Sequence, residues 1–186
     1  MKLLIMGPPG VGKGTQARFI KDKLGIAHIS TGELLREEIS KTTEVGIVAK
    51  KYIDQGKLVP DNYLFNLVSE RLNEADCGKG YILDGFPRTL NQASGFEIIM
   101  NNFGHELDRV ISLYADEDAL VERLVNRGKS SGRSDDSSNI IRNRQKIYWQ
   151  QTAPLLDFYR DRGLLKNVNG LGDIKEITSR ILNEIK

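Results

Sequence analysis

The sequence predicts an α/β fold, a three-layer sandwich in which a five-stranded parallel sheet lies between two layers of helices. Two observations lead to this prediction. Short apolar runs alternate with helical patterns along the chain, and the first run leads directly into a glycine-rich turn and a helix. The 186 residues suffice for one domain with a sizeable core, and no repeat or low-complexity linker divides them.

Five short apolar runs are the predicted strands. Runs of this length and composition are typical of strands buried on both faces of a parallel sheet. They cover residues 3–6, 26–29, 81–83, 110–114 and 164–167.

Apolar residues at helical spacing predict helices between these strands. The first begins in the glycine-rich turn and ends at Gly25, and Asp61 is the expected N-cap of a later one, after Pro60. About fifty residues separate the second and third strands, which exceeds an ordinary crossover and predicts a lobe of its own. The polar stretch 127–138 contains two glycines and is either a flexible surface loop or a short lid.

Composition narrows the class of protein. A formal net charge of +2 does not suggest a nucleic-acid or membrane surface. The chain has no apolar run of about 18 residues, and its first residues already form a strand, so we expect a cytoplasmic protein. Cys77 is the single cysteine, which excludes an internal disulfide and a four-cysteine zinc site. A monomer is the default expectation, since no exposed apolar stripe stands out.

Residues 7–15, here called the phosphate loop, follow the first strand and open the first helix. Pro8 and Pro9 lack an amide hydrogen, but every residue from Gly10 to Thr15 retains one. Successive amides at a helix N-terminus can cradle phosphate oxygens, and Lys13 adds a cation for the outer phosphates. The alternative is a glycine-rich turn without a ligand, and the strand and helix on either side favour phosphate binding. Gly14 stands where the usual pattern has the Ser or Thr that meets Mg²⁺.

A second candidate site follows the third strand, in the run Asp84-Gly85-Phe86-Pro87-Arg88. A carboxylate at the carboxyl end of a central strand lies beside the phosphate loop in such sheets, so Asp84 is placed to hold the water shell of Mg²⁺. The alternative is that Asp84 is only a turn or capping residue. Arginines occur in several separate segments, and the planar fork of a guanidinium suits phosphate oxygens, although each arginine alone could be a solvated surface charge. They are Arg36, Arg88, Arg123, Arg127, Arg133 and Arg144.

These motifs resemble those of the adenylate kinases and related nucleoside monophosphate kinases. The glycine after Lys13 is typical of that family, and the run from Asp84 to Thr89 with Gln92 resembles its most specific signature. Further segments resemble the start and end of its monophosphate-binding lobe, its short lid, and the loop near the donor adenine. They are residues 30–36, 56–60, 132–136 and 169–172. Long-lid members have an insertion that can carry four cysteines and zinc, and this chain lacks both.

The resemblance implies a single kinase domain with a phosphate-binding-loop core and two smaller parts. The core would comprise residues 1–29, 60–126 and 138–186, the helical monophosphate-binding lobe 30–59, and the short lid 127–137. Mg²⁺ would be held mainly by nucleotide and water, with Asp84 in its outer shell and no zinc.

The resemblance also implies roles for individual residues. Donor ATP would be bound by Gly10, Val11, Gly12, Lys13, Gly14, Thr15, Arg127 and Gly172, with Arg127 also facing the adenine. Acceptor AMP would be bound by Thr31, Arg36, Lys57, Leu58, Val59, Gly85, Phe86, Pro87, Arg88, Gln92, Arg133 and Arg144. Catalysis would rest on Lys13, Arg88, Arg123, Arg133 and Arg144. Thr31 and Gln92 would read the acceptor base.

The implied activity is reversible phosphoryl transfer from MgATP to AMP, giving two ADP. The attacking group is a phosphate oxygen, which is mostly ionised at neutral pH, so no general base is expected. Two alternatives stay open. The acceptor could be CMP or UMP, or the chain could be a nucleotide-binding switch, although it lacks the Asn-Lys-x-Asp guanine motif of GTPases.

Overall fold

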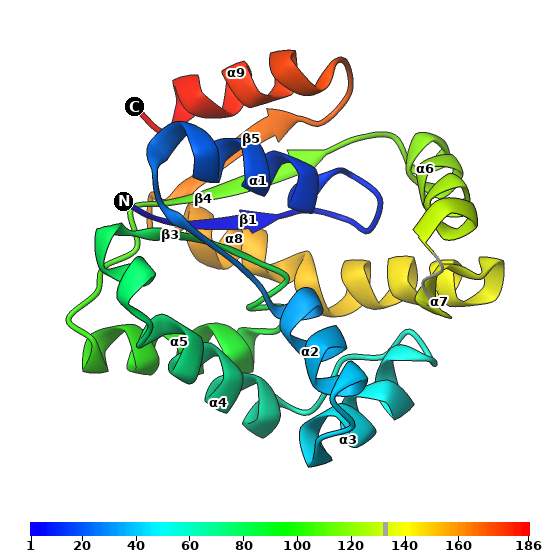
Figure 1. The fold of residues 1–186 in the computed structure, drawn as a ribbon. Helices are drawn as coiled ribbons and strands as arrows, with labels where there is room; N and C mark the ends of the chain where they lie inside the picture. Colours follow the sequence, from blue (N-terminus) through cyan, green and yellow to red (C-terminus); the bar gives the residue numbers. More distant parts are fainter. Residues whose placement is uncertain (132–133) are drawn as a thin grey trace.

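A five-stranded parallel sheet forms the middle of the computed structural model, which describes residues 1–131 and 134–186 (Figure 1). The strand order is β2-β3-β1-β4-β5. The strands are β1 (Lys2–Met6), β2 (Ala27–Ser30), β3 (Tyr81–Asp84), β4 (Arg109–Tyr114) and β5 (Leu165–Asn169). All five predicted strands are therefore confirmed, with boundaries shifted by one or two residues.

The longer helices are α1 (Lys13–Leu24), α2 (Thr31–Ser40), α3 (Glu44–Ile53), α4 (Asp61–Leu72), α5 (Leu90–Asn102), α6 (Glu117–Ser131), α7 (Ser138–Ile147), α8 (Pro154–Arg160) and α9 (Ile174–Glu184). Short helical turns lie at η1 (Ala75–Lys79), η2 (Ser134–Asp136) and η3 (Tyr148–Thr152). Helix α1 ends at Gly25 as predicted, where the Gly25 N–H donates to the Lys21 carbonyl. No helix in the described ranges combines the length and the apolar composition that a membrane span requires.

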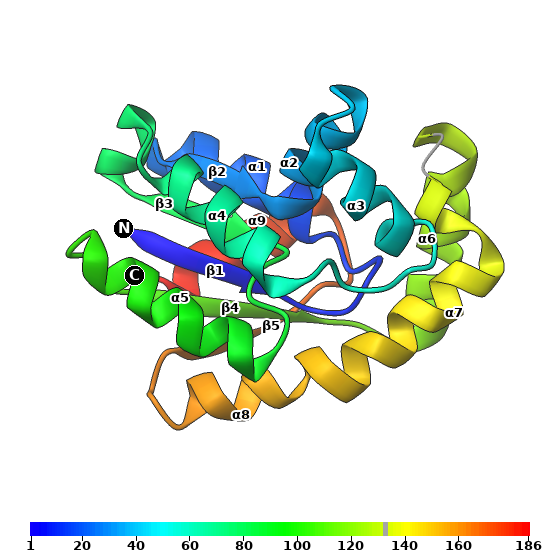
Figure 2. The same ribbon diagram turned by 90° about the horizontal axis from the view of Figure 1, so that it is seen from below.

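On the central strands β1 and β3, alternate residues enter two different cores, as expected for the predicted three-layer sandwich. On β1, Leu3 and Ile5 pack under helices α1 and α9. Leu4 and Met6 face the opposite way, toward the core beneath α4, α5 and α8. Figures 1 and 2 show these helix layers on the two faces of the sheet.

The centre of the sheet determines where a ligand can bind. Strand β1 pairs with β3 on one side and with β4 on the other, so the chain order reverses around it. In open parallel sheets, ligands bind beyond the carboxyl ends of the strands at such a reversal. The loop after β1, residues 7–12, lies at that point.

Helices α2 and α3 project away from the sheet, as Figure 2 shows. They pack closely on each other, since a Cβ added at Gly46 would lie 2.1 Å from the Glu38 carbonyl oxygen. The predicted lobe between the second and third strands thus contains a helix pair of its own. Its boundaries, like those of the lid, stay a prediction.

Two sequence expectations differ from the structure. Residues 127–131 continue helix α6 instead of beginning a loop, because Gly128 fits against Asp136, where an added Cβ would lie 3.0 Å from the Asp136 carbonyl oxygen. Asp61 is the first residue of α4 rather than its N-cap, which is Pro60. The Asp61 carboxylate instead accepts hydrogen bonds from Asn91 and Gln92 on α5.

Candidate active site

The phosphate loop presents open amides at the start of α1. Gly12 is the N-cap, with φ of 99°, and the first hydrogen bond of the helix runs from the Gln16 N–H to the Gly12 carbonyl at 3.0 Å. The amides of Lys13, Gly14 and Thr15 precede that bond, so the helix geometry leaves them without an intrahelical acceptor. Together with the helix dipole they form a site suited to phosphate.

Gly10 is required where the loop approaches helix α6. It has φ of +89°, and an added Cβ would lie 2.6 Å from the Leu120 carbonyl oxygen. Val11, the next residue, was expected to direct its amide toward phosphate. The Val11 N–H donates to the Pro8 carbonyl at 3.3 Å, so in this structure its amide serves the turn rather than an open cradle.

Lys13 lies inside the loop, where its Nζ donates to the carbonyls of Gly7 at 2.7 Å and Pro8 at 3.0 Å. Burial lowers the pKa of Lys13 to about 7, which the Asp84 carboxylate opposes and the nearby Arg88 and other arginines reinforce. The Lys13 amine therefore lies close to Asp84 and Arg88, two residues with predicted roles in nucleotide binding.

Asp84 ends strand β3 beside the start of α1. Its Oδ2 atom lies 3.3 Å from the position that a Cβ on Gly14 would occupy, so the missing side chain of Gly14 leaves room for this carboxylate. Its carbonyl accepts a hydrogen bond from Thr31 Oγ1 at 3.3 Å. A carboxylate oxygen next to a phosphate loop is chemically suited to Mg²⁺ or its water shell. Among the described residues, no cluster of three or more His, Cys, Asp or Glu side chains is arranged to hold a metal ion directly.

Arg88 lies across the site from Lys13, just beyond strand β3. Its Nε donates to the Gly85 carbonyl at 2.7 Å, which fixes the direction of the guanidinium. Burial lowers the pKa of Arg88, and the adjacent Arg144 lowers it further, while Asp84 acts in the opposite direction. Arg36 on α2 is close enough to contribute as well. A buried cation next to other cations is poised to bind an anion.

Gln92 is fully buried, and its side-chain amide is held at both ends. Its Oε1 accepts from the Arg88 N–H at 2.7 Å, and its Nε2 donates to Asp61 Oδ1 at 2.8 Å. An amide has two donor hydrogens and two acceptor lone pairs, so one of each is left for a base. Gln92 therefore also fixes Arg88, which the sequence did not reveal, and its role in reading the base stays a prediction.

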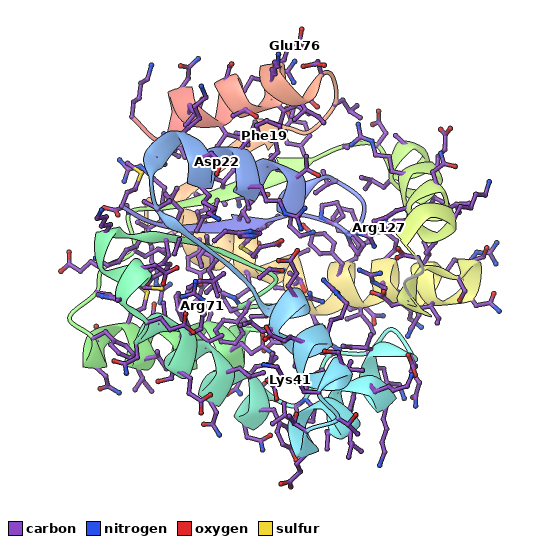
Figure 3. The ribbon with its side chains drawn as sticks, viewed as in Figure 1. Phe19, Asp22, Lys41, Arg71, Arg127 and Glu176 are labelled. Carbon is purple, nitrogen blue, oxygen red and sulfur yellow. The ribbon has the colours of Figure 1, made fainter. Side chains whose placement is uncertain are left out.

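Two arginines near the predicted lid are bound by buried carboxylates. Arg127 makes a two-point contact with Asp136, with Nε and Nη2 each 2.7 Å from a carboxylate oxygen. Arg144 Nη1 lies 2.7 Å from Asp135 and 2.9 Å from Asp136. Figure 3 shows Arg127 on the side of α6 that faces the phosphate loop. No role was predicted for Asp135 and Asp136, although two adjacent acidic residues between arginines in the sequence could have indicated ion pairs.

Arg123, one turn before Arg127 on α6, points elsewhere. Its Nη1 donates to the Gly170 carbonyl at 3.2 Å, in the loop expected near the donor adenine. That loop touches the phosphate loop, since a Cβ added at Gly170 would lie 2.9 Å from Val11 Cγ2. The structure thus brings Arg123, rather than Arg127, to this loop. Gly172, two residues further on, is exposed.

The structure does not bring every predicted side chain to the site. The Phe86 ring is 2% exposed and packs edge-to-face on Phe65 and Phe96, so it belongs to the core. Val59 is also buried in the core, whereas Lys57 is exposed and Leu58 is half-buried. In residues 57–59 and in Gly85–Pro87, a substrate would therefore be contacted mainly by backbone atoms. Arg133 lies outside the described residues.

Comparisons with known proteins point to one family. The model of the adenylate kinase family matches residues 5–164. The chain is 49% identical over 184 residues to an adenylate kinase of Leptospira biflexa, covering 99% of both chains. It is 48% identical over 186 residues to one of Stenotrophomonas maltophilia, covering 100% of both. An adenylate kinase of Clavibacter michiganensis is 48% identical over 180 residues, which is 97% of this chain and 90% of that one.

Proposed function

The chain belongs to the adenylate kinase family, and from this premise we propose how its own residues bind and join the two nucleotides. The family resemblance expected from the sequence is confirmed. The chain is a transferase that moves a phosphoryl group reversibly from MgATP to AMP, which gives two ADP.

The donor triphosphate binds at the phosphate loop in this proposal. The amides of Lys13, Gly14 and Thr15 supply hydrogen bonds, and the Lys13 amine turns from the loop carbonyls to the outer phosphates. The adenine lies beside Arg123 and the loop at Gly170, because these two groups are already in contact at the edge of the loop. Asp84 would hold the water shell of Mg²⁺ beside the phosphate loop, and the ion would supply positive charge that neutralises the phosphates.

The acceptor AMP binds on the opposite side, with its phosphate on Arg88 and Arg36. The hydrogen bond from Arg88 to Gly85 supports this, since it aims the guanidinium without neutralising it. Thr31 and Gln92 read the adenine, together with the backbone of residues 57–59. The acceptor-binding lobe then corresponds to residues 30–59 and the lid to 127–137, around a core of residues 1–29, 60–126 and 138–186.

Catalysis in this proposal consists of positioning and charge stabilisation. An ionised oxygen of the acceptor phosphate attacks in line with the bond that breaks, so no side chain must remove a proton. Lys13, Arg88, Arg127 and Arg144 surround the transferred group, and Arg123 completes the donor side. A catalytic role for Arg133 is proposed from the family resemblance alone. Exclusion of water by the lid prevents transfer to solvent.

The observation that carries this proposal is the convergence of cations at the carboxyl ends of β1 and β3. Arg88, Arg144 and Arg127 all lie close enough to Lys13 to lower its pKa, and the four residues come from four separate segments of the chain. Asp135 and Asp136 already pair with the two lid arginines, so Lys13 and Arg88 are the cations of this set that the phosphates of two substrates would neutralise.

Initial rates with MgATP and a panel of acceptors test the proposal. We expect turnover with AMP to exceed turnover with CMP or UMP by at least about a hundredfold, because a pocket built to hydrogen-bond one base leaves its polar groups unpaired with another. Comparable rates with CMP or UMP would contradict the acceptor assignment. ATP hydrolysis without use of any monophosphate would favour a nucleotide switch instead.

A further inference from the structure

Three successive carbonyls at the start of the phosphate loop are each held by a side-chain donor. Lys13 Nζ binds the carbonyls of Gly7 and Pro8, at 2.7 Å and 3.0 Å. Gln145 on α7 binds the third, since its Nε2 donates to the Pro9 carbonyl at 3.1 Å. These contacts matter because a carbonyl oxygen carries partial negative charge and must point away from a bound phosphate.

The two donors differ in what happens when a nucleotide binds. The Lys13 amine is needed by the outer phosphates, so its contacts with Gly7 and Pro8 weaken or break. Gln145 carries no charge and comes from a different element, and its contact with Pro9 need not change. Gln145 is therefore the donor that can hold the loop both before and after the nucleotide arrives.

The surroundings of Gln145 indicate that its side-chain amide does not increase the stability of the fold. The side chain is 4% exposed, and its Oε1 meets no hydrogen-bond donor among the residues that the structure describes. A buried acceptor without a partner lowers stability, and an apolar side chain of similar size would avoid this cost. Among the described residues, the hydrogen bond to Pro9 is the contact for which the amide is required.

We propose that Gln145 is a positioning residue for the donor nucleotide, acting through the Pro9 carbonyl to keep the phosphate loop in its binding conformation. The residue touches neither substrate in this account. This inference rests on the proposed donor site. It adds that helix α7 holds the phosphate loop in place from outside the loop. The preceding residue, Arg144, faces the carboxylates of Asp135 and Asp136, so α7 serves the lid and the phosphate loop from adjacent positions.

Calorimetric titration of Gln145→Leu tests the proposal, with the Mg²⁺ complex of a non-hydrolysable ATP analogue and, separately, with AMP. Loss of one hydrogen bond should raise the Kd of the ATP analogue about fivefold and leave the Kd of AMP unchanged. The melting temperature should change little, since the substitution removes an unpaired buried acceptor but also leaves the Pro9 carbonyl without its donor. Gln145→Met, which is apolar but flexible, should behave alike and replaces the leucine variant if that variant folds poorly.

Asn143→Ala is the matched control. Asn143 lies on the same helix and its Nδ2 also donates to a backbone carbonyl, that of Gln55 at 2.7 Å, outside the phosphate loop. This variant should leave the Kd of the ATP analogue unchanged. An unchanged Kd of the analogue in Gln145→Leu, or an equal rise for the analogue and AMP, would overturn the proposal. The donor site itself is tested separately, by whether the wild-type protein binds the analogue at all.

Discussion

The cations of the site fall into two groups that differ in what they are bonded to. Lys13 and Arg88, at the ends of the central strands, donate to the backbone carbonyls of Gly7, Pro8 and Gly85. Arg127 and Arg144, near the lid, bind the buried carboxylates of Asp135 and Asp136. The first group is held in place without being neutralised, whereas the second is already paired with negative charge.

The pKa shifts follow this division. Burial lowers the pKa of Lys13 to about 7 and also lowers the pKa of Arg88. Burial alone would lower the pKa of Arg127 too, but its hydrogen bonds with Asp136 raise it. The comparison indicates that Lys13 and Arg88 are available to bind substrate phosphate. In the proposed reaction, Arg127 and Arg144 would have to share or exchange their carboxylate partners in order to contact the transferred group.

Arg88→Ala should show the largest effect, because it removes an unneutralised cation from the acceptor site. A charge-assisted hydrogen bond contributes about 1.5–3 kcal/mol, so the Kd of AMP should rise roughly 10- to 150-fold. The Kd of an ATP analogue should change little, since Arg88 lies outside the phosphate loop. Calorimetric titration with each ligand measures both values.

An exposed arginine provides the control for that variant. Arg162 pairs with Glu97 at 3.2 Å on the surface, and exposed pairs contribute little. Arg162→Ala should therefore leave both Kd values unchanged. Equal losses of AMP and ATP affinity in Arg88→Ala would mean that the two sides of the site are not separate.

Asp136→Asn should have a smaller effect, mainly on stability. The Asp136 carboxylate is fully buried between Arg127 and Arg144, and Arg127 is one third exposed, which screens part of its charge. We expect the free energy of unfolding to fall by about 2 kcal/mol, and the melting temperature by about 4–8 °C. Thermal denaturation measures the change.

The exposed pair of Asp157 with Arg160 offers the comparison. Asp157→Asn changes a carboxylate in the same way but should shift the melting temperature by less than about 2 °C. Similar shifts in the two variants would show that the carboxylates near the lid do not neutralise their arginines more strongly than a surface pair does.

The sequence was sufficient for features that depend on neighbouring residues. The central strands β1 and β3 consist mostly of apolar residues, and the phosphate loop is one contiguous segment with its own strand and helix. Asp84 ends strand β3 and Arg88 follows four residues later, so their place at the carboxyl edge of the sheet could be predicted once the strand was recognised.

Several features that the sequence missed depend on contacts between different elements of the fold. Asp61 looks like a helix cap locally, but Gln92 on another helix competes for its carboxylate. Residues 127–131 are polar and contain glycine, which favours a loop, yet the two-point contact of Arg127 with Asp136 stabilises the helix there. The contact of Gln145 with Pro9 spans 136 positions of the chain, and nothing in the local pattern indicates it.

Proton uptake on donor binding tests the central claim, that Lys13 is held without a neutralising partner until phosphate arrives. With a pKa of about 7, most Lys13 side chains are uncharged at pH 8 in the free protein. Bound phosphate favours the charged amine and raises its pKa, so the protein must take up a proton. The phosphates contribute little, since their second pKa is about 6.

Calorimetric titration with the ATP analogue at pH 8, in two buffers of different ionisation enthalpy, gives the number of protons exchanged. The account predicts uptake that approaches about one proton in the wild-type protein. It predicts almost none in Lys13→Arg, because an arginine stays charged throughout. Equal uptake in the two proteins, or none in the wild type, would contradict the account.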